Sequence, residues 1–344
     1  MVALFYFLIY SDSRLIILQA EITRRANLIE FIKRDKLKKF HFGTIIFLHK
    51  LHKIRERDDM TTTTKGKLKL TTALVLASTL WMGCAQSTHG KGTGIATGIV
   101  NGEPVQANDP LAASTVDLYY VYPGSDSVQN LCTGTVIGDR TILCAAHCFV
   151  DASSQLGISV PELVKRVKVG FGVNIISSAA DKSITLVDVA NVTVNPDYKM
   201  NDLDNASKGT PLYDMSVIHL AAPMPNGTKI APLLDHADVL KVGTELTLAG
   251  YGLTAGGYAG TPATSLNKTH VNIDNAAVNP TQFSYAVVDS HSACSGDSGG
   301  PAYYTDATGV VYVAGVTSWG DGNCKQLGVY TSVPAMITWI RASM

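Results

Sequence analysis

The sequence predicts an all-β domain over residues 99–344, built as a barrel or a sandwich. Short β-branched runs recur along this part of the chain, Gly, Pro, Asn and Asp separate them, and helical patterns are few. Strands at such spacing are typical of all-β folds. The predicted strands include 135–137, 167–169, 183–189, 245–248, 310–316 and 329–332. One short helix is predicted over 334–341, because Pro334 suits the first turn of a helix.

The composition is that of a folded, globular protein. The chain has 344 residues, of which 46% are hydrophobic and 16% charged, so it can form one large domain or two medium ones. The formal net charge of 0 conceals an uneven distribution. Residues 1–59 carry 12 basic and 7 acidic side chains, residues 60–98 carry 4 lysines and no acid, and residues 99–344 therefore carry 12 basic and 21 acidic ones. An acidic body repels phosphate backbones, which argues against nucleic-acid binding.

Residues 60–84 have the profile of an export signal, or signal peptide. Three lysines, at 65, 67 and 69, precede the apolar stretch 70–81, which is too short to span a bilayer. A short amphipathic or buried helix is the alternative. A signal that begins at Met60 suggests that translation starts there. Residues 1–59 would then be upstream mistranslation, and the alternative is an unstructured N-terminal extension.

Cys84 offers two processing routes. Gly83-Cys84 resembles a bacterial lipoprotein signal, although Trp81 stands where leucine is usual. A lipid on Cys84 would anchor the mature chain to the membrane, as a periplasmic or outer-membrane protein. Gly83-Cys84-Ala85 also fits ordinary signal cleavage, which gives a soluble secreted product, and we favour the lipoprotein route. Residues 85–98 are small and rich in Gly and Thr, and are predicted to be a flexible linker or propeptide.

Five further cysteines favour disulfides over a metal site. They are Cys132, Cys144, Cys148, Cys294 and Cys324. No CxxC pair or His/Cys cluster has the spacing of a structural zinc site, so no metal is expected. Disulfides indicate an oxidising compartment, and the odd number leaves one cysteine unpaired.

Three motifs carry the candidate chemistry. They are Cys-Ala-Ala-His-Cys at 144–148, Asp-Met-Ser-Val-Ile-His-Leu at 214–220 and Cys-Ser-Gly-Asp-Ser-Gly-Gly-Pro at 294–301. A serine hydroxyl is a poor nucleophile at neutral pH and needs a neighbouring base. His147 can take the proton of Ser298, and Asp214 would fix the tautomer of the imidazole and stabilise its protonated form. The glycines around Ser298 permit a tight turn that aims the N–H groups of Gly296 and Ser298 at one spot, as an oxyanion hole.

In the order His, Asp, Ser, these motifs resemble the trypsin/chymotrypsin-like serine peptidase family, and the resemblance covers residues 99–344. It implies two six-stranded antiparallel β-barrels with a short C-terminal helix. It also implies a hydrolase that needs no cofactor and cleaves proteins or peptides, with His147, Asp214 and Ser298 as catalytic residues. Ser318 matches the family residue that hydrogen-bonds Asp214 and the substrate backbone. We expect a monomer.

The resemblance also implies two disulfides. Cys132 lies sixteen residues before Cys148, which is the family spacing for the bond beside the catalytic histidine. Cys294 and Cys324 match the bond that braces the substrate pocket. Cys144 stands where the family usually has Ser or Thr, and is expected to be a buried free thiol.

The segment Ile-Val-Asn-Gly at 99–102 resembles the new N-terminus that the family forms when a zymogen is cleaved. In the family this ammonium pairs with the Asp before the nucleophile, here Asp297, because a buried ammonium is costly unless paired. Gly98, and not Arg or Lys, precedes Ile99. We therefore expect maturation by a protease that prefers small residues, or by self-cleavage. An ordinary strand start at Ile99 is the alternative.

Three positions match the family's substrate pocket. Ser292 stands at the floor, where trypsins carry Asp, and Gly320 and Gly328 stand at the walls. With no buried carboxylate to offset desolvation of Arg or Lys, this slot is expected to take an apolar or aromatic P1 side chain. Leu327 occupies a typical Pro position in a loop shorter than usual, which would narrow the slot.

Two rival functions are weighed. A catalytically inactive homologue that acts as a binding protein is compatible with the same fold, but every triad residue is present. An esterase of the α/β-hydrolase class would need the order Ser, Asp, His and alternating helices, and the sequence has neither.

Overall fold

The computed structural model describes residues 3–11, 14–22, 99–199, 213–256 and 260–344. The chain divides into two compact units, Met1–Ser87 and Thr88–Met344. In the first unit, β1 (Ala3–Ser11) and β2 (Arg14–Ile22) form an antiparallel pair. The predicted signal and linker over residues 60–98 lie outside the described residues.

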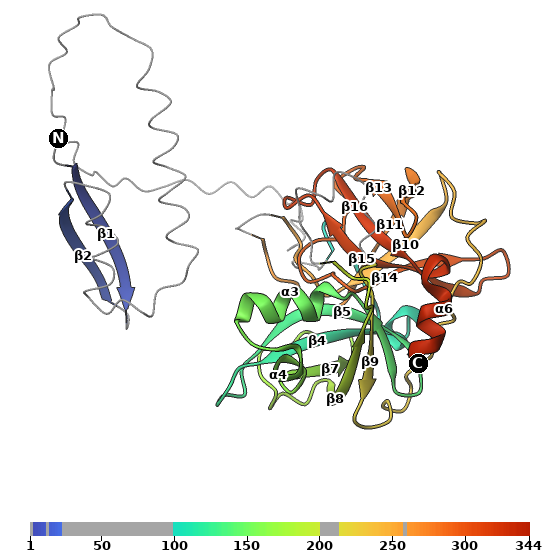
Figure 1. The fold of residues 1–344 in the computed structure, drawn as a ribbon, viewed down its shortest axis with the longest axis horizontal. Coiled ribbons are helices and arrows are strands. Elements are labelled where there is room, and N and C mark those ends of the chain that lie inside the picture. The colour runs from blue at the N-terminus through green and yellow to red at the C-terminus, as the bar shows by residue number, and fades with distance from the viewer. Residues whose placement is uncertain (1–2, 12–13, 23–98, 200–212, 257–259) are drawn as a thin grey trace, which may run out of the picture. The chain divides into compact units, whose positions relative to one another are not determined.

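Six strands of the second unit close into a barrel (Figure 1). They are β4 (Thr115–Val121), β5 (Val128–Gly138), β6 (Thr141–Cys144), β7 (Val167–Phe171), β8 (Thr185–Val194) and β9 (Ser216–Leu220). Neighbouring strands are antiparallel, in the order β4-β5-β6-β9-β8-β7. Branched side chains such as Val116, Val136 and Ile142 are fully buried. They fill the interior, so this barrel is a packed support for the loops at its ends.

The other strands form a second, eight-stranded antiparallel sheet. They are β3 (Glu103–Pro104), β10 (Glu245–Gly250), β11 (Asn267–Asn272), β12 (Asn275–Asn279), β13 (Gln282–Ala286), β14 (Pro301–Thr305), β15 (Val311–Gly320) and β16 (Leu327–Ser332). Their order is β12-β13-β16-β15-β14-β10-β11-β3. β11 also contacts β13, so the six inner strands curl towards each other. This confirms the predicted two-barrel fold, with β12 and β3 as additional edge strands.

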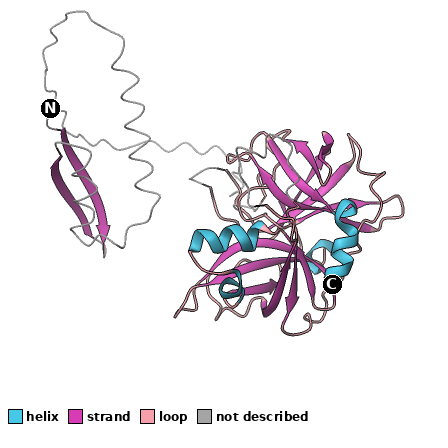
Figure 2. Ribbon diagram, in the orientation of Figure 1, coloured by secondary structure: helices cyan, strands magenta, loops and turns pink. Residues whose placement is uncertain are grey.

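Four helical segments accompany the strands in the described part of the second unit (Figure 2). They are η1 (Pro110–Ala113), α3 (His147–Leu156), α4 (Val160–Val164) and α6 (Val333–Ser343). The predicted C-terminal helix is α6, and the Ser332 side chain caps it by accepting the N–H of Ala335. The sequence did not predict α3, whose first turn has no side-chain cap from a neighbouring residue.

Two large hydrophobic clusters hold the strands of the described second unit together, and a smaller third one gathers around Tyr119. The first extends from the closed barrel to β14 and β15 of the eight-stranded sheet and includes Val333, Met336 and Ile340, so α6 packs on a core that both sheets share. The second lies in the eight-stranded sheet and includes Ile99, which is fully buried. Burying apolar surface stabilises the domain by roughly 25 cal/mol per Å².

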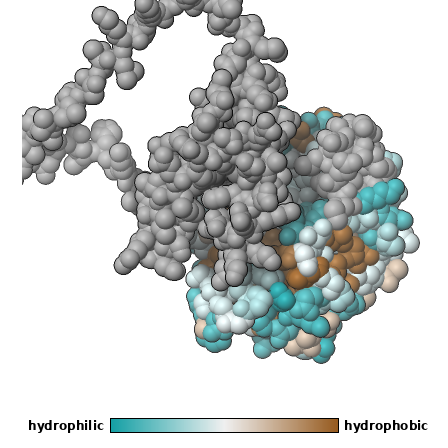
Figure 3. All heavy atoms as spheres, turned by 60° about the vertical axis from the view of Figure 1, so that its left-hand side comes forward, coloured by the Kyte–Doolittle hydropathy of each residue, from teal (hydrophilic) through white to brown (hydrophobic). Residues whose placement is uncertain are grey.

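The described surface of the second unit is mostly polar or of intermediate polarity on the face that Figure 3 shows, with an apolar area near its middle. Within the described ranges, no helix combines the length and apolarity that crossing a lipid bilayer requires.

Candidate active site

The strand register of the first barrel brings His147 and Asp214 together. Cys144, the last residue of β6, pairs with Ser216, the first residue of β9. His147 follows β6 by three residues, and Asp214 precedes β9 by two. Because the strands are antiparallel, these two segments leave the barrel at the same end. The two side chains therefore meet although 67 residues separate them.

Two hydrogen bonds join His147 to Asp214. The imidazole Nδ1 lies 2.7 Å from Asp214 Oδ2, and the backbone N–H of His147 donates to Oδ1 at 2.9 Å. His147 is the first residue of α3, so the Asp214 carboxylate serves as the cap of this helix. Asp214 is only 3% exposed. The carboxylate thus fixes the ring, with Nε2 left to face the reacting groups.

A second row of hydrogen bonds holds Asp214 from the other side. The Ser318 hydroxyl donates to Asp214 Oδ2 at 2.7 Å, and Gln282 Nε2 donates to Ser318 Oγ at 3.1 Å. Gln282 Oε1 in turn accepts the indole N–H of Trp319 at 3.3 Å. The motifs did not reveal Gln282. Its only sequence signal is an amide side chain at the start of an apolar strand, and the structure buries that side chain.

The electrostatics of the pair favour an imidazole that accepts a proton. Burial lowers the pKa of His147, but the charge and hydrogen bond of Asp214 outweigh it, so the pKa is raised above 6.5. Burial likewise opposes ionisation of Asp214. The charge of His147, its hydrogen bonds and the Ser318 hydroxyl more than compensate, so the pKa of Asp214 is lowered below 3.8. Asp214 stays ionised and stabilises an imidazolium beside it.

Ser298 lies on a tight turn that only glycine neighbours permit. Gly296 has φ +96°, and a Cβ there would lie 2.5 Å from Asn130 Oδ1. Gly299 has φ +78°, and a Cβ there would lie 2.4 Å from Cys144 Sγ. The carbonyl of Ser298 accepts the N–H of Thr133 at 2.8 Å. The turn is therefore pressed against β5 of the first barrel.

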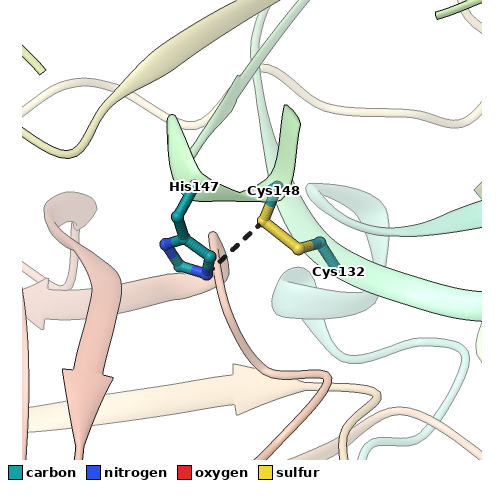
Figure 4. A group of neighbouring side chains, drawn as sticks. All are labelled: Cys132, His147 and Cys148. Atoms are coloured by element: carbon teal, nitrogen blue, oxygen red, sulfur yellow. Dashed lines mark hydrogen bonds between the residues drawn. A yellow bond between two sulfur atoms is a disulfide. The ribbon is translucent and has the colours of Figure 1, made fainter. Parts of the chain in front are cut away.

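Ser298 and His147 lie beside the same disulfide. His147 Nε2 lies 3.8 Å from Cys148 Sγ (Figure 4), and that sulfur lies 3.8 Å from the carbonyl oxygen of Ser298. Among the described residues, the Ser298 hydroxyl makes no hydrogen bond, and none joins it to His147. Such bonds are often long before substrate binds.

Two disulfides are formed in the part of the chain that the structure describes, Cys132–Cys148 and Cys294–Cys324. Cys144 is a buried free thiol, and burial raises its pKa. Cys132, His147 and Cys148 lie within 4.8 Å of one another (Figure 4). Both sulfurs are consumed in the disulfide, so they cannot act as the thiolate ligands that zinc prefers. This cluster does not fit a metal.

The candidate oxyanion hole has its two N–H groups free. In the described part of the chain, neither Gly296 nor Ser298 donates its N–H to another residue. The Gly296 carbonyl accepts from the Thr133 hydroxyl at 2.9 Å, which holds the peptide from below. Asn130 packs against Gly296 and donates to the buried carboxyl of Asp117 at 2.6 Å. Sequence reasoning missed Asn130 and Asp117, because no motif contains them.

The segment at Ile99 docks beside the loop of Asp297. Val100 donates to the Ser292 carbonyl at 2.8 Å and accepts its N–H at 3.3 Å. The Asp297 carboxylate accepts the N–H groups of Gly252 at 2.8 Å and Cys294 at 2.7 Å. Burial raises the pKa of Asp297 to about 7, and these two N–H groups offset it only in part. In the continuous chain the nitrogen of Ile99 is a peptide nitrogen, so it brings no charge to Asp297.

A cavity of about 140 Å³ opens beside Ser298. Its lining includes Gly320 and Gly328, which the resemblance assigns to the walls of the substrate pocket, and also Ser318. Ser292, which was expected to form the floor of an open slot, does not line the cavity and is fully buried. The cavity therefore does not extend to Ser292. The physical reason is a tyrosine, Tyr285, whose hydroxyl lies 3.1 Å from Ser292 Oγ. Nothing in the motifs predicted this side chain at the floor.

Comparison with known proteins agrees with this geometry. The sequence model of the Trypsin family matches residues 99–340. Trypsin of Phaedon cochleariae is 27% identical over 242 residues, which cover 66% of this chain and 84% of that protein. Phenoloxidase-activating enzyme 1 of Spodoptera litura is 28% identical over 235 residues, which cover 65% of this chain and 61% of the relative.

Transmembrane protease serine 9 of Rattus norvegicus is 27% identical over 230 residues, or 63% of this chain. This chain spans only 20% of the length of the rat protein, so the likeness concerns only a part of that protein. The family match covers well over half of the 344 residues. The chain therefore belongs to the trypsin family and is a serine endopeptidase.

Proposed function

We propose that this chain is an exported serine endopeptidase that cleaves peptide bonds through His147, Asp214 and Ser298. The observation that carries the proposal is the continuous hydrogen-bonded row from Ser318 through Asp214 to His147, which ends beside the turn of Ser298. A buried carboxylate that holds an imidazole next to a serine is the arrangement that acyl transfer needs.

The proposed reaction has two halves. Ser298 Oγ attacks the peptide carbonyl carbon while His147 Nε2 takes its proton, and the negative oxygen of the tetrahedral intermediate accepts the N–H groups of Gly296 and Ser298. The C–N bond then breaks, and His147 gives the proton to the leaving amine. A water molecule repeats the attack on the acyl-enzyme and regenerates Ser298. Each oxyanion donor is expected to contribute about 3–4 kcal/mol to the transition state.

Activation by cleavage before Ile99 is part of the proposal. The buried carboxyl of Asp297 receives only neutral N–H donors in the continuous chain. An ammonium at Ile99 would supply the missing positive charge, and the docking of Val100 against Ser292 supports its approach. Gly98 precedes the bond, so the activating enzyme is a protease with small-residue preference or the protein itself.

Export and anchoring rest on residues outside the described ranges. The basic and apolar pattern of 60–84 supports export, and residues 85–98 would be removed as a propeptide or remain as a linker. Lipid attachment at Cys84 would hold the enzyme at a bacterial membrane, whereas ordinary cleavage would release it.

The substrate pocket supports an uncharged P1 side chain. Of the residues that line the cavity, Asp321 is the one charged residue, and its carboxylate already accepts the N–H groups of Lys325, Gln326 and Leu327. Ser292, where trypsins carry Asp, brings no carboxylate to the inner end of the slot, so an Arg or Lys bound there would lose its hydration without a buried charge in return. We therefore expect apolar side chains to be preferred over basic ones.

The test is peptide hydrolysis by a chain that starts at Ile99, with Ser298→Ala as the control. Hydrolysis of protein substrates by the chain that starts at Ile99, and not by its Ser298→Ala variant, supports the proposal. The alternative, an inactive homologue that acts as a binding protein, is favoured by the absent Ser298–His147 hydrogen bond. It predicts equal and negligible hydrolysis by both chains. N-terminal sequencing of the naturally active form tests the activation step, which requires Ile99 as first residue.

A further inference from the structure

Tyr285 occupies the space behind the wall of the candidate substrate pocket. It lies in β13, directly opposite Gly328 in β16. A Cβ placed on Gly328 would lie 2.5 Å from both Cε1 and Oη of the Tyr285 ring. The tyrosine is 1% exposed. The room that the glycine leaves is therefore filled by this ring and is not open to a substrate.

Hydrogen bonds fix the outer end of the ring. The N–H of Ala293 donates to Tyr285 Oη at 2.9 Å, and Oη lies 3.1 Å from Ser292 Oγ. Ser292 Oγ donates to the carbonyl of Ala293 at 2.8 Å, so its oxygen is left to accept the tyrosine proton. Every polar atom of this group has a partner. Displacing the ring for a large substrate would break these bonds inside the protein, where each unmade bond is costly.

The cavity ends at the level of Ala293 and Gly328. Both residues line it, whereas Ser292 behind them is fully buried. Its volume of about 140 Å³ includes the space over Ser298 and Cys294, which the substrate backbone must use. A dry cavity that accepts benzene measures about 150 Å³. The part of the cavity beyond the nucleophile is therefore smaller than that volume.

We propose that Tyr285 closes the inner end of the P1 slot and makes the enzyme selective for small, uncharged P1 side chains such as those of Ala and Val. This inference rests on the proposed function, because it concerns the substrate of the same site. It narrows the preference expected from the sequence, since Ser292 and Gly328 alone suggested a slot open to aromatic side chains.

The experiment uses the chain that starts at Ile99 and blocked tetrapeptide p-nitroanilides that differ only at P1, which is Ala, Val, Phe or Arg. For wild type, kcat/KM with Ala and Val is expected to exceed that with Phe and with Arg by roughly 10-fold or more, as ill-fitting side chains cost in shaped pockets. Tyr285→Ala removes the ring and is expected to raise the ratio of Phe to Ala hydrolysis by about 10-fold or more.

Tyr285→Phe is the matched control, because it keeps the ring and removes only the hydroxyl. Its ratio of Phe to Ala hydrolysis is expected to stay within about threefold of wild type, since one hydrogen bond contributes only modestly. Titration with a fluorophosphonate counts competent sites in every variant and thereby separates misfolding from altered preference. If Tyr285→Ala does not fold, the P1 preferences of wild type and Tyr285→Phe still test the inference. It requires that both proteins hydrolyse the Ala and Val substrates faster than the Phe and Arg substrates.

Wild-type hydrolysis that is fastest with Phe or with Arg overturns this inference and leaves the proposed function intact. An unchanged ratio in folded Tyr285→Ala also overturns it. Absence of hydrolysis and of labelling with every substrate in wild type contradicts the proposed function itself, and the inference with it.

Discussion

Asp214 accepts three hydrogen bonds from described residues, and each has a separate consequence. The first orients the ring of His147, the second caps the first turn of α3, and the third, from the Ser318 hydroxyl, stabilises the ionised carboxylate. A single buried carboxylate therefore couples the imidazole of His147 to the helix that carries it. Replacing the Asp214 carboxylate therefore affects both the tautomer and the pKa of His147.

The pH dependence of hydrolysis follows from this pair. Burial lowers the pKa of His147, but Asp214 raises it by more, to a value above 6.5. His147 must be neutral to take the Ser298 proton, so kcat/KM is expected to fall as the pH drops through this raised value. Asp214→Asn removes the charge. The variant is expected to lose about 10⁴ in kcat, as in related enzymes, and its acid limb should move to lower pH.

Profiles of kcat/KM against pH for both proteins check this expectation. An acid limb at the same pH in Asp214→Asn and in wild type would show that the carboxylate does not set the pKa of His147. Circular dichroism of both proteins serves as the control for folding.

Among the elements, the turn around Ser298 depends most on its glycines. Gly299→Ala would place Cβ 2.4 Å from Cys144 Sγ and 2.6 Å from the carbonyl of Thr133. We expect a loss of about 1–3 kcal/mol from overpacking, in addition to about 1–2 kcal/mol from the left-handed backbone. Gly309→Ala is the matched control, because Gly309 has φ +85° but no heavy atom near its added Cβ.

Urea unfolding of both variants, in a Ser298→Ala background that prevents self-digestion, measures the two losses. The difference between them isolates the packing of the nucleophile turn against the first barrel. Equal losses in Gly299→Ala and Gly309→Ala would contradict the close approach of this turn to Cys144.

The disulfide Cys294–Cys324 braces two elements that form the cavity. It closes a loop of sequence separation 30 that contains Ser298 and all of β15. Replacing both cysteines by Ala is expected to lower the free energy of unfolding by about 3 kcal/mol. We expect KM to rise more than kcat falls, because Cys294 and Cys324 line the cavity whereas His147 and Asp214 are held by other bonds. Urea unfolding measures the loss of stability, and steady-state kinetics measure KM and kcat. An unchanged free energy of unfolding would contradict the expectation.

At the same scale, the sequence predicted some elements and not others. The strands predicted at 167–169 and 245–248 correspond to β7 and β10, since the apolar residues of the sequence pattern are the ones that the structure buries there. α3 escaped prediction because its cap, Asp214, comes from a distant residue. The triad motif was visible as residue types, but the pocket floor was not. The ring of Tyr285 comes to lie behind Gly328 through the pairing of β13 with β16, and such pairing has no local signal.

For the whole molecule, cleavage before Ile99 should change how stability depends on pH. In the intact chain burial raises the pKa of Asp297 to about 7, compared with 3.8 when exposed. The folded state then binds a proton that the unfolded state has released, so the free energy of unfolding falls as the pH rises between these values. A new ammonium at Ile99 would favour the ionised carboxylate and remove much of this fall.

Urea unfolding at pH 5 and pH 7.5 tests this expectation, with Ser298→Ala in the intact chain and in the chain that starts at Ile99. Asp117, whose pKa is raised to about 8 by burial, contributes a similar fall to both forms, so it cancels in the comparison. The same loss of stability in both forms would show that Ile99 does not pair with Asp297.

The most direct test of the central claim is covalent labelling of the nucleophile. The chain that starts at Ile99 is treated with a fluorophosphonate, and the modified residue is mapped by mass spectrometry. We predict a single adduct on Ser298, which is absent from Ser298→Ala and forms far more slowly in the uncleaved chain. A folded, cleaved protein that stays unlabelled, or that carries the adduct on another residue, would contradict the account.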